Sequence, residues 1–159
     1  MAKKNYHGVQ INQSPTIVER AGADIADVRN RIMKYDDNGN VVLATAGTDM
    51  PVGIALIEAG YNDISGIESG KVVTEDDVDI LVKDMGVVLT GAEIKKGQEI
   101  AAGADGLAAV AASGDYVLGI ALQNAGANEY CKVQIAKYIK TGGGPSASGE
   151  QMTEEEGTL

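Results

Sequence analysis

Residues 39–60 read GNVVLATAGTDMPVGIALIEAG and residues 106–126 read GLAAVAASGDYVLGIALQNAG, so the chain carries one stretch twice. Nine positions are identical in the two copies: Gly39/Gly106, Ala44/Ala111, Gly47/Gly114, Gly53/Gly119, Ile54/Ile120, Ala55/Ala121, Leu56/Leu122, Ala59/Ala125 and Gly60/Gly126. The offset is 67 residues up to Gly47 and 66 from Gly53, which places one extra residue beside Pro51. A self-match of this length indicates an internal duplication.

Each copy contains the same hairpin signal, Asn38-Gly39 in the first and Asp105-Gly106 in the second. These dipeptides favour two-residue type I′ turns, in which both central residues have positive φ. The flanking strand segments are 31–35 and 41–44 in the first copy and 99–102 and 107–110 in the second. Each hairpin is followed by a Gly-Ile-Ala-Leu strand, whose glycine suggests a bulge or a close backbone approach.

The pattern predicts a mainly β fold, a compact barrel or sandwich built from two tandem repeats. We assign residues 1–20 to an extended N-terminal arm, 21–140 to the duplicated body and 141–159 to a disordered acidic tail. Within the body the repeats cover about 22–83 and 91–137, and each closes with a strand, 78–82 or 133–136. The first repeat has an insertion at 61–77. Helical signals are weak, and we expect at most one short helix, either in this insertion or within residues 16–27.

The composition limits the classes of function. The 159 residues include no Trp or Phe and only six Tyr, so the core is thin and we expect burial by self-association or docking. A net charge of −10 argues against nucleic acid as the partner. The sequence shows no signal peptide and no apolar run that could span a membrane. The single cysteine, Cys131, is expected as a small buried or half-buried strand residue.

No pattern of chemistry-bearing residues predicts an enzyme, a metal site or a cofactor. The acidic run at 36–40 is explained by its hairpin, and the run at 75–79 lacks the ligand spacing of a calcium loop. The Gly70-Lys71 pair lacks the upstream glycine and the Ser or Thr of a phosphate loop. His7 is the only histidine, and nothing nearby orients it for catalysis.

The stretch GAEIKKGQEIAAGADGLAAVAASGDYVLGIALQNAGANEYCKVQIAKY (91–138) resembles the body of the capsid decoration, or cement, proteins of tailed bacteriophages. The first-copy stretch KYDDNGNVVLATAGTDMPVGIALIEAG (34–60) fits the same description. The resemblance implies a non-enzymatic virion protein, made in the host cytoplasm, that binds the outside of the phage head. It would stabilise contacts between major capsid protein subunits, as a homo-oligomer with a trimer favoured.

The same resemblance implies that an extended terminal arm makes the capsid contact. The candidate contact residues are Lys3, Lys4, Tyr6, His7, Val9 and Ile11. An alternative from another class is a duplicated barrel-sandwich carrier or small-ligand domain associated with an enzyme. That alternative needs a modified lysine, for which Lys95 or Lys96 in the Lys-Lys-Gly-Gln turn is the candidate.

Overall fold

The computed structural model describes residues 14–56 and 70–142. These residues form ten β-strands and one short 3-10 turn, and they contain no α-helix. Nowhere in these two ranges is there a helix long and apolar enough to cross a membrane. The first five strands are β1 (Thr16–Arg20), β2 (Ile32–Tyr35), β3 (Val41–Leu43), β4 (Gly53–Ala55) and β5 (Asp77–Leu81). The others are β6 (Met85–Leu89), β7 (Glu99–Ala102), β8 (Ala108–Val110), β9 (Tyr116–Ala121) and β10 (Tyr130–Ile139), with η1 (Ala104–Gly106) before β8.

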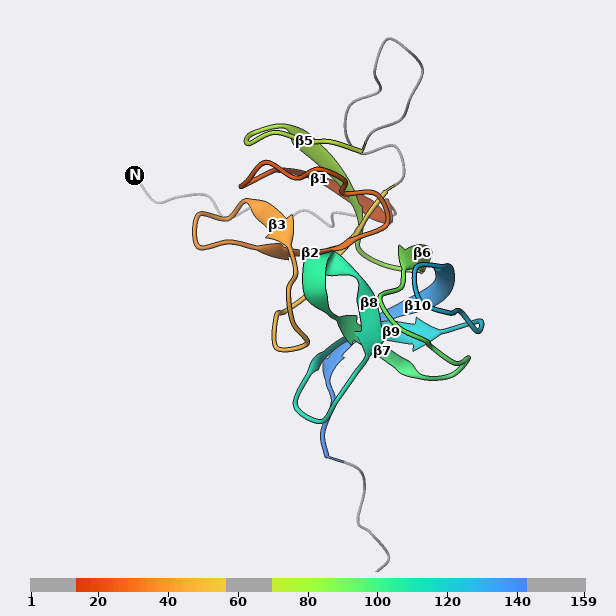
Figure 1. The fold of residues 1–159 in the computed structure, drawn as a ribbon. Helices are drawn as coiled ribbons and strands as arrows, with labels where there is room; N and C mark the ends of the chain where they lie inside the picture. Colours follow the sequence, from red (N-terminus) through yellow and green to blue (C-terminus); the bar gives the residue numbers. More distant parts are fainter. Residues whose placement is uncertain (1–13, 57–69, 143–159) are drawn as a thin grey trace, which may run out of the picture.

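The strands form two five-stranded antiparallel sheets with the same internal order (Figure 1). The first sheet runs β1-β5-β4-β2-β3 and the second β6-β10-β9-β7-β8. We call the half built on the first sheet unit 1 and the other half unit 2. The prediction of a mainly β fold made of two tandem repeats is therefore confirmed.

Neither sheet closes into a full barrel. In unit 1 the two outer strands, β1 and β3, approach each other only through an isolated bridge between Ala21 and Val41. Unit 2 repeats this with a bridge between Thr90 and Ala108. Each unit therefore has an open side between its outer strands, and the whole is an unclosed, sandwich-like arrangement.

Strand registers show which residues of the two units are equivalent. Gly53 pairs with Met33 in unit 1, and Gly119 pairs with Ile100 in unit 2. A Cβ on either glycine would lie 2.1 Å from a carbonyl oxygen of the neighbouring strand, that of Leu81 or of Gln134. The predicted close backbone approach is therefore correct, and it explains why both copies have glycine before Ile-Ala-Leu.

The β2–β3 hairpin forms, but its predicted type I′ turn is wrong. Asp36 N donates to Asn40 O at 2.8 Å, and Gly39 has a φ of 80° while Asn38 does not have a positive φ. This is a three-residue loop, in which a type I turn is followed by one left-handed residue. The Asp36 carboxylate stabilises it by accepting hydrogen bonds from the amides of Asn38 (2.8 Å) and Asn40 (2.9 Å).

The β7–β8 hairpin also has a three-residue loop in place of the predicted two-residue one. Asp105 and Gly106 do have positive φ, 55° and 69°, but Ala104 belongs to the loop as well. Gly103 N donates to Leu107 O at 2.7 Å and closes the loop.

Two further expectations are corrected. The extra residue of the first copy is at Thr45 and not beside Pro51. The turn bond from Asp49 N to Ala46 O is repeated from Asp115 N to Ala112 O, so the 66-residue offset already holds there. Residues 16–27 contain no helix, because 16–20 form β1 and pair with β5. These five residues lie in the range that the sequence assigned to the arm, and the arm and tail boundaries stay predictions.

Alternating side chains build the core of each unit. In β10, Cys131 and Val133 are buried while Lys132 and Gln134 are exposed, so of the buried or half-buried strand position expected for Cys131 the structure has the buried one. Unit 1 has its own buried cluster, to which Met33 and Ile80 belong. The larger cluster of unit 2 also contains three residues of unit 1, namely Ile32, Ala44 and Ile54. The two units are thus joined by a shared core.

Candidate functional site

The residues that the sequence proposed for capsid contact lie outside the described ranges. This holds for Lys3, Lys4, Tyr6, His7, Val9 and Ile11. Most of the 61–77 insertion, up to residue 69, lies outside them too. The site is therefore built from the described body.

The turn residues of the two hairpins have different surroundings. A Cβ on Gly39 would have nothing within 4 Å, so the first hairpin tip faces open space. The second tip packs on unit 1: Gly106 N donates to Ala44 O at 2.7 Å, and Arg31 Nη1 donates to Asp105 O at 2.9 Å. Equivalent sequence signals thus serve an exposed turn in one unit and a contact between units in the other.

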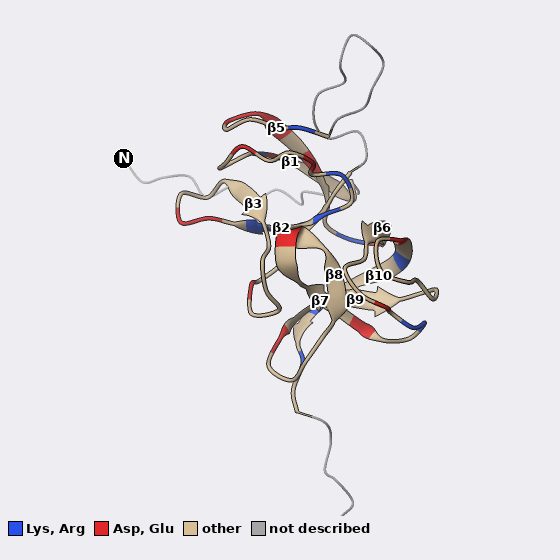
Figure 2. Ribbon diagram, in the orientation of Figure 1, with Lys and Arg blue, Asp and Glu red and all other residues tan. Residues whose placement is uncertain are grey.

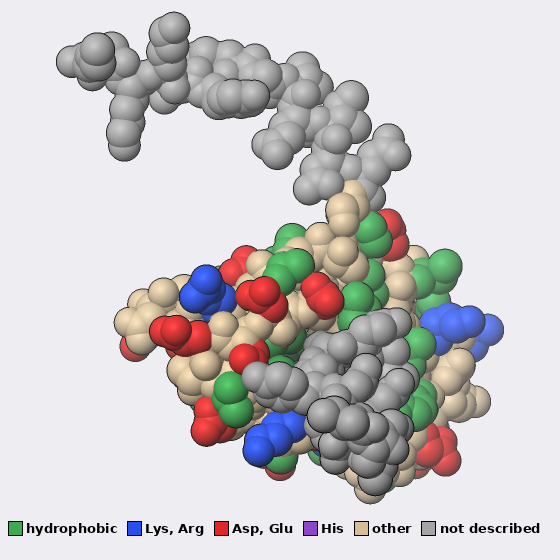
Figure 3. All heavy atoms as spheres, turned by 90° about the horizontal axis from the view of Figure 1, so that it is seen from above, with side chains coloured by type: hydrophobic (Ala, Val, Ile, Leu, Met, Phe, Trp, Pro, Cys, Tyr) green, Lys and Arg blue, Asp and Glu red, His purple; other side chains and the backbone are tan. Residues whose placement is uncertain are grey.

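Several aspartates, in the acidic runs and at Asp24, accept hydrogen bonds from backbone amides. Besides the Asp36 contacts, Asp76 Oδ2 accepts the Val73 amide at 2.9 Å and Asp24 Oδ1 accepts the Thr74 amide at 2.9 Å. No group of three or more His, Cys, Asp or Glu side chains within 14–56 and 70–142 is placed to hold a metal ion. Acidic residues are spread over both units (Figure 2), and acidic side chains outnumber basic ones on the face in Figure 3.

An apolar groove lies where the two units meet. Its volume is about 780 Å³. Unit 1 supplies strand residues of β1 and β2, the 48–52 loop and the residue after β5, while unit 2 supplies β9 and the end of β10. The lining residues are Ile17, Lys34, Tyr35, Thr48, Asp49, Met50, Pro51, Val52, Val82, Tyr116, Val117, Lys137, Tyr138 and Ile139. We call this feature the junction groove.

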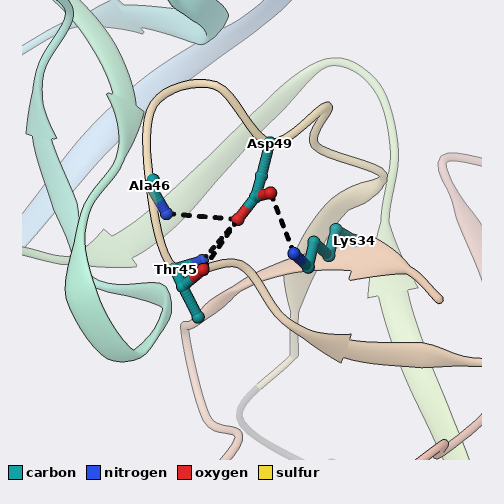
Figure 4. Close-up of polar contacts among 4 residues, drawn as sticks. All are labelled: Lys34, Thr45, Ala46 and Asp49. Carbon is teal, nitrogen blue, oxygen red and sulfur yellow. Dashed lines mark hydrogen bonds and ion pairs between the residues drawn. The ribbon is translucent and has the colours of Figure 1, made fainter.

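An ion pair fixes the loop on one side of the junction groove (Figure 4). Lys34 Nζ lies 2.8 Å from Asp49 Oδ1, and Asp49 Oδ2 accepts hydrogen bonds from Thr45 N (2.8 Å), Thr45 Oγ1 (3.0 Å) and Ala46 N (3.2 Å). Burial alone would raise the pKa of Asp49, but these hydrogen bonds outweigh it and lower the pKa to about 2. The carboxylate therefore stays ionised and holds the loop closed.

Bonds across the groove tie unit 2 to unit 1. Lys137 Nζ donates to Val52 O, and Tyr116 N donates to Gly47 O at 2.8 Å. Burial lowers the pKa of Lys137.

A further hydrogen bond lies within unit 2. Tyr138 OH donates to Glu99 Oε1 at 2.6 Å, and this hydrogen bond raises the pKa of Tyr138 to about 12.

The junction groove combines polar groups that bond within the protein with an exposed apolar rim. Several polar groups in the junction groove engage the protein itself, as in the Lys34–Asp49 pair and the Lys137–Val52 bond. Its rim, in contrast, is apolar and accessible: Met50 is 64% exposed, Ile139 53% and Tyr35 46%. Exposed apolar side chains gathered around a depression are a common feature of protein interaction surfaces.

Sequence reasoning did not find the junction groove. Its lining residues come from distant parts of both repeats, and only the docking of the units brings them together. One signal was available in Met50-Pro51, an apolar pair in a turn where the second copy has Tyr116-Val117. The Lys95 and Lys96 turn lies elsewhere, with backbone amides bound to Gln98 Oε1 and Asn124 Oδ1.

The chain was compared with family models, with curated proteins and with solved structures. No protein-family model matches the chain, and no curated protein matches it. Among solved structures, the fold is similar to that of the head fiber gp8.5 N base of bacteriophage phi29, with a TM-score of 0.56. The two chains are 20% identical, and the match covers 76% of this chain and 92% of that one. At this identity the likeness shows a shared fold.

Proposed function

We propose that the chain is a structural protein of a tailed-phage virion that binds the outer surface of the head and stabilises contacts between major capsid protein subunits. The observation that carries this proposal is the fold match to the base of a phage head fiber, which covers nearly all of that chain. It agrees with the independent resemblance of residues 34–60 and 91–138 to decoration proteins.

The described surface supports a binding role. The accessible apolar side chains at the junction groove form a place for a protein partner, and the net charge of −10 disfavours DNA as that partner. A protein on the outside of a head has no need to bind DNA. We therefore propose the major capsid protein as partner, with the N-terminal arm as one contact and a homo-oligomer, trimer favoured, as the bound form.

Co-sedimentation tests the function. Purified protein is mixed at micromolar concentration with phage heads that lack it, and the heads are pelleted. We expect the protein in the pellet at a saturable ratio to capsid protein, and raised resistance of the heads to heat. Protein that remains in the supernatant over this range would refute the proposal.

Deletion of residues 1–15 tests the arm separately. We expect capsid affinity to fall while the β-sheet circular dichroism spectrum stays unchanged, because the deletion ends before β1. Unchanged affinity of this truncation would remove the arm from the contact.

A further inference from the structure

The open side of unit 2 is covered by unit 1. At the outer edge of β6, Leu89 N donates to Asn30 O at 2.9 Å, and Asn30 Nδ2 donates to Val87 O at 2.9 Å. Asn30 thus satisfies an amide and a carbonyl that an edge strand would leave unpaired. Behind it, Ile32 and Ile54 enter the core of unit 2, both nearly fully buried.

The equivalent side of unit 1 has no such cover. The registers of β1 on β5 and of β6 on β10 make Val18 equivalent to Val87 and Arg20 equivalent to Leu89. No described residue pairs with the Val18 carbonyl or the Arg20 amide in the way that Asn30 pairs with their counterparts. The outer edge of β1 is therefore open within the described structure.

The junction groove lies beside this open edge. Its residues Ile17, Val52 and Val82 are equivalent to Gly86, Leu118 and Ile135 of unit 2. In unit 2 this region is filled by unit 1, since a Cβ on Gly86 would lie 3.4 Å from Cδ1 of Ile54. In unit 1 the corresponding space is the junction groove.

A second copy of the chain is poorly suited to fill the groove in the way that unit 1 fills unit 2. Strand β2 of unit 1 inserts Ile32 into unit 2. The equivalent strand of unit 2 is β7, and its register places Glu99 at the position of Ile32. The end of β10 already covers that element: Glu99 bonds Tyr138 and Lys140, and Lys140 Nζ donates to Ala111 O at 3.0 Å. Docking of a second copy in this way is therefore disfavoured, because it would place the Glu99 carboxylate where unit 2 receives Ile32.

We propose that the junction groove and the free edge of β1 form a docking site for an extended segment of the capsid protein. The segment pairs its backbone with Val18 and Arg20 and places aliphatic side chains beside Ile17, Val52 and Val82, as Asn30, Ile32 and Ile54 do on unit 2. The site is continuous with the contact between the units, because Val52 O accepts the Lys137 bond from unit 2. This inference rests on the proposed function and names its contact surface.

Two matched substitutions test the site. Met50 at the groove rim and Met85 on β6 are exposed to nearly the same degree, 64% and 61%. Met50→Lys and Met85→Lys therefore make the same chemical change, and we expect both variants to melt within about 2 °C of wild type since surface changes cost little. In co-sedimentation with phage heads, we expect Met50→Lys to bind at least tenfold more weakly and Met85→Lys within twofold of wild type.

Photo-crosslinking identifies the occupant. Benzoylphenylalanine at position 50 is expected to crosslink to capsid protein, and at position 85 it is not. Crosslinks from position 50 only to residues 1–13 or to a second copy would overturn the docking site. So would full head binding by Met50→Lys, which would leave the proposed function standing. Failure of wild-type protein to bind heads would overturn both.

Discussion

The two glycines that begin the Gly-Ile-Ala-Leu strands give the sharpest test of the duplicated fold. Gly53→Ala would place a Cβ 2.1 Å from Leu81 O, whereas ordinary contact begins at 3.4 Å. The obstacle is backbone and cannot rotate away, so β4 and β5 must separate by about 1 Å or more. Separation of that size breaks ladder hydrogen bonds, each worth roughly 1 kcal/mol, and adds strain of about 1–3 kcal/mol.

We therefore expect Gly53→Ala to lower the free energy of unfolding by about 3 kcal/mol or more. For a chain of this size the melting temperature would fall by roughly 6–12 °C. Gly119→Ala should behave alike, because its Cβ would lie 2.1 Å from Gln134 O. The measurement is urea unfolding followed by circular dichroism, with thermal melts alongside.

Gly126→Ala is the matched control. A Cβ there would meet Glu129 at an ordinary 3.4 Å, and Gly126 is not among the residues with positive φ. The control should be neutral or stabilising by about 0.5 kcal/mol, because alanine lowers the entropy of the unfolded chain. Losses below about 1 kcal/mol for both Gly53→Ala and Gly119→Ala would refute the close-approach explanation.

Three further outcomes follow from the described contacts. Asp49→Asn should destabilise the protein at neutral pH. The pKa of Asp49 is depressed from 3.8 to about 2, so its contribution is present above about pH 4, and the difference from wild type should shrink as the pH falls towards 2 in pH-dependent urea melts. Ile32→Ala should cost about 2–5 kcal/mol and unfold both units in one transition, because Ile32 is fully buried in the shared core; two separate transitions in wild type would contradict this. Cys131 should react with a thiol reagent only as the protein unfolds, because the side chain is fully buried and burial raises its pKa; fast labelling under native conditions would be the contrary result.

The sequence predicted the parts of the fold that are set locally. Alternation gave the buried Cys131 and Val133 of β10, and the self-match gave the two equivalent sheets. Turn geometry was not predictable from the dipeptides alone. The Asp36 carboxylate binds the amides of Asn38 and Asn40, and this selects a three-residue loop that an Asn-Gly signal does not distinguish from a two-residue one.

The junction groove could not be predicted because it arises from the docking of one unit on the other. The docking depends on positions where the two copies differ, whereas the internal duplication is recognised from positions where they are identical. The pair Ile32 and Glu99 shows this, since one is a fully buried contact between the units and the other a half-buried carboxylate bound to Lys140. Equivalent positions with an apolar residue in one copy and a charged residue in the other were the sequence feature that could have indicated this contact.

The same differences distinguish the outer faces of the two described units. Unit 1 offers an apolar face to unit 2, whereas Glu99 and the end of β10 occupy the equivalent face of unit 2. Unit 1 differs at its own open side. Val88 and Ala102 are buried in unit 2, and the equivalent positions of unit 1 hold Glu19 and Tyr35. The Tyr35 hydroxyl donates a hydrogen bond to Glu19 Oε1 at 2.9 Å. That single polar bond leaves the groove beside it apolar and accessible, so the open end of unit 1 has the features of a binding surface and the closed end of unit 2 those of a cap.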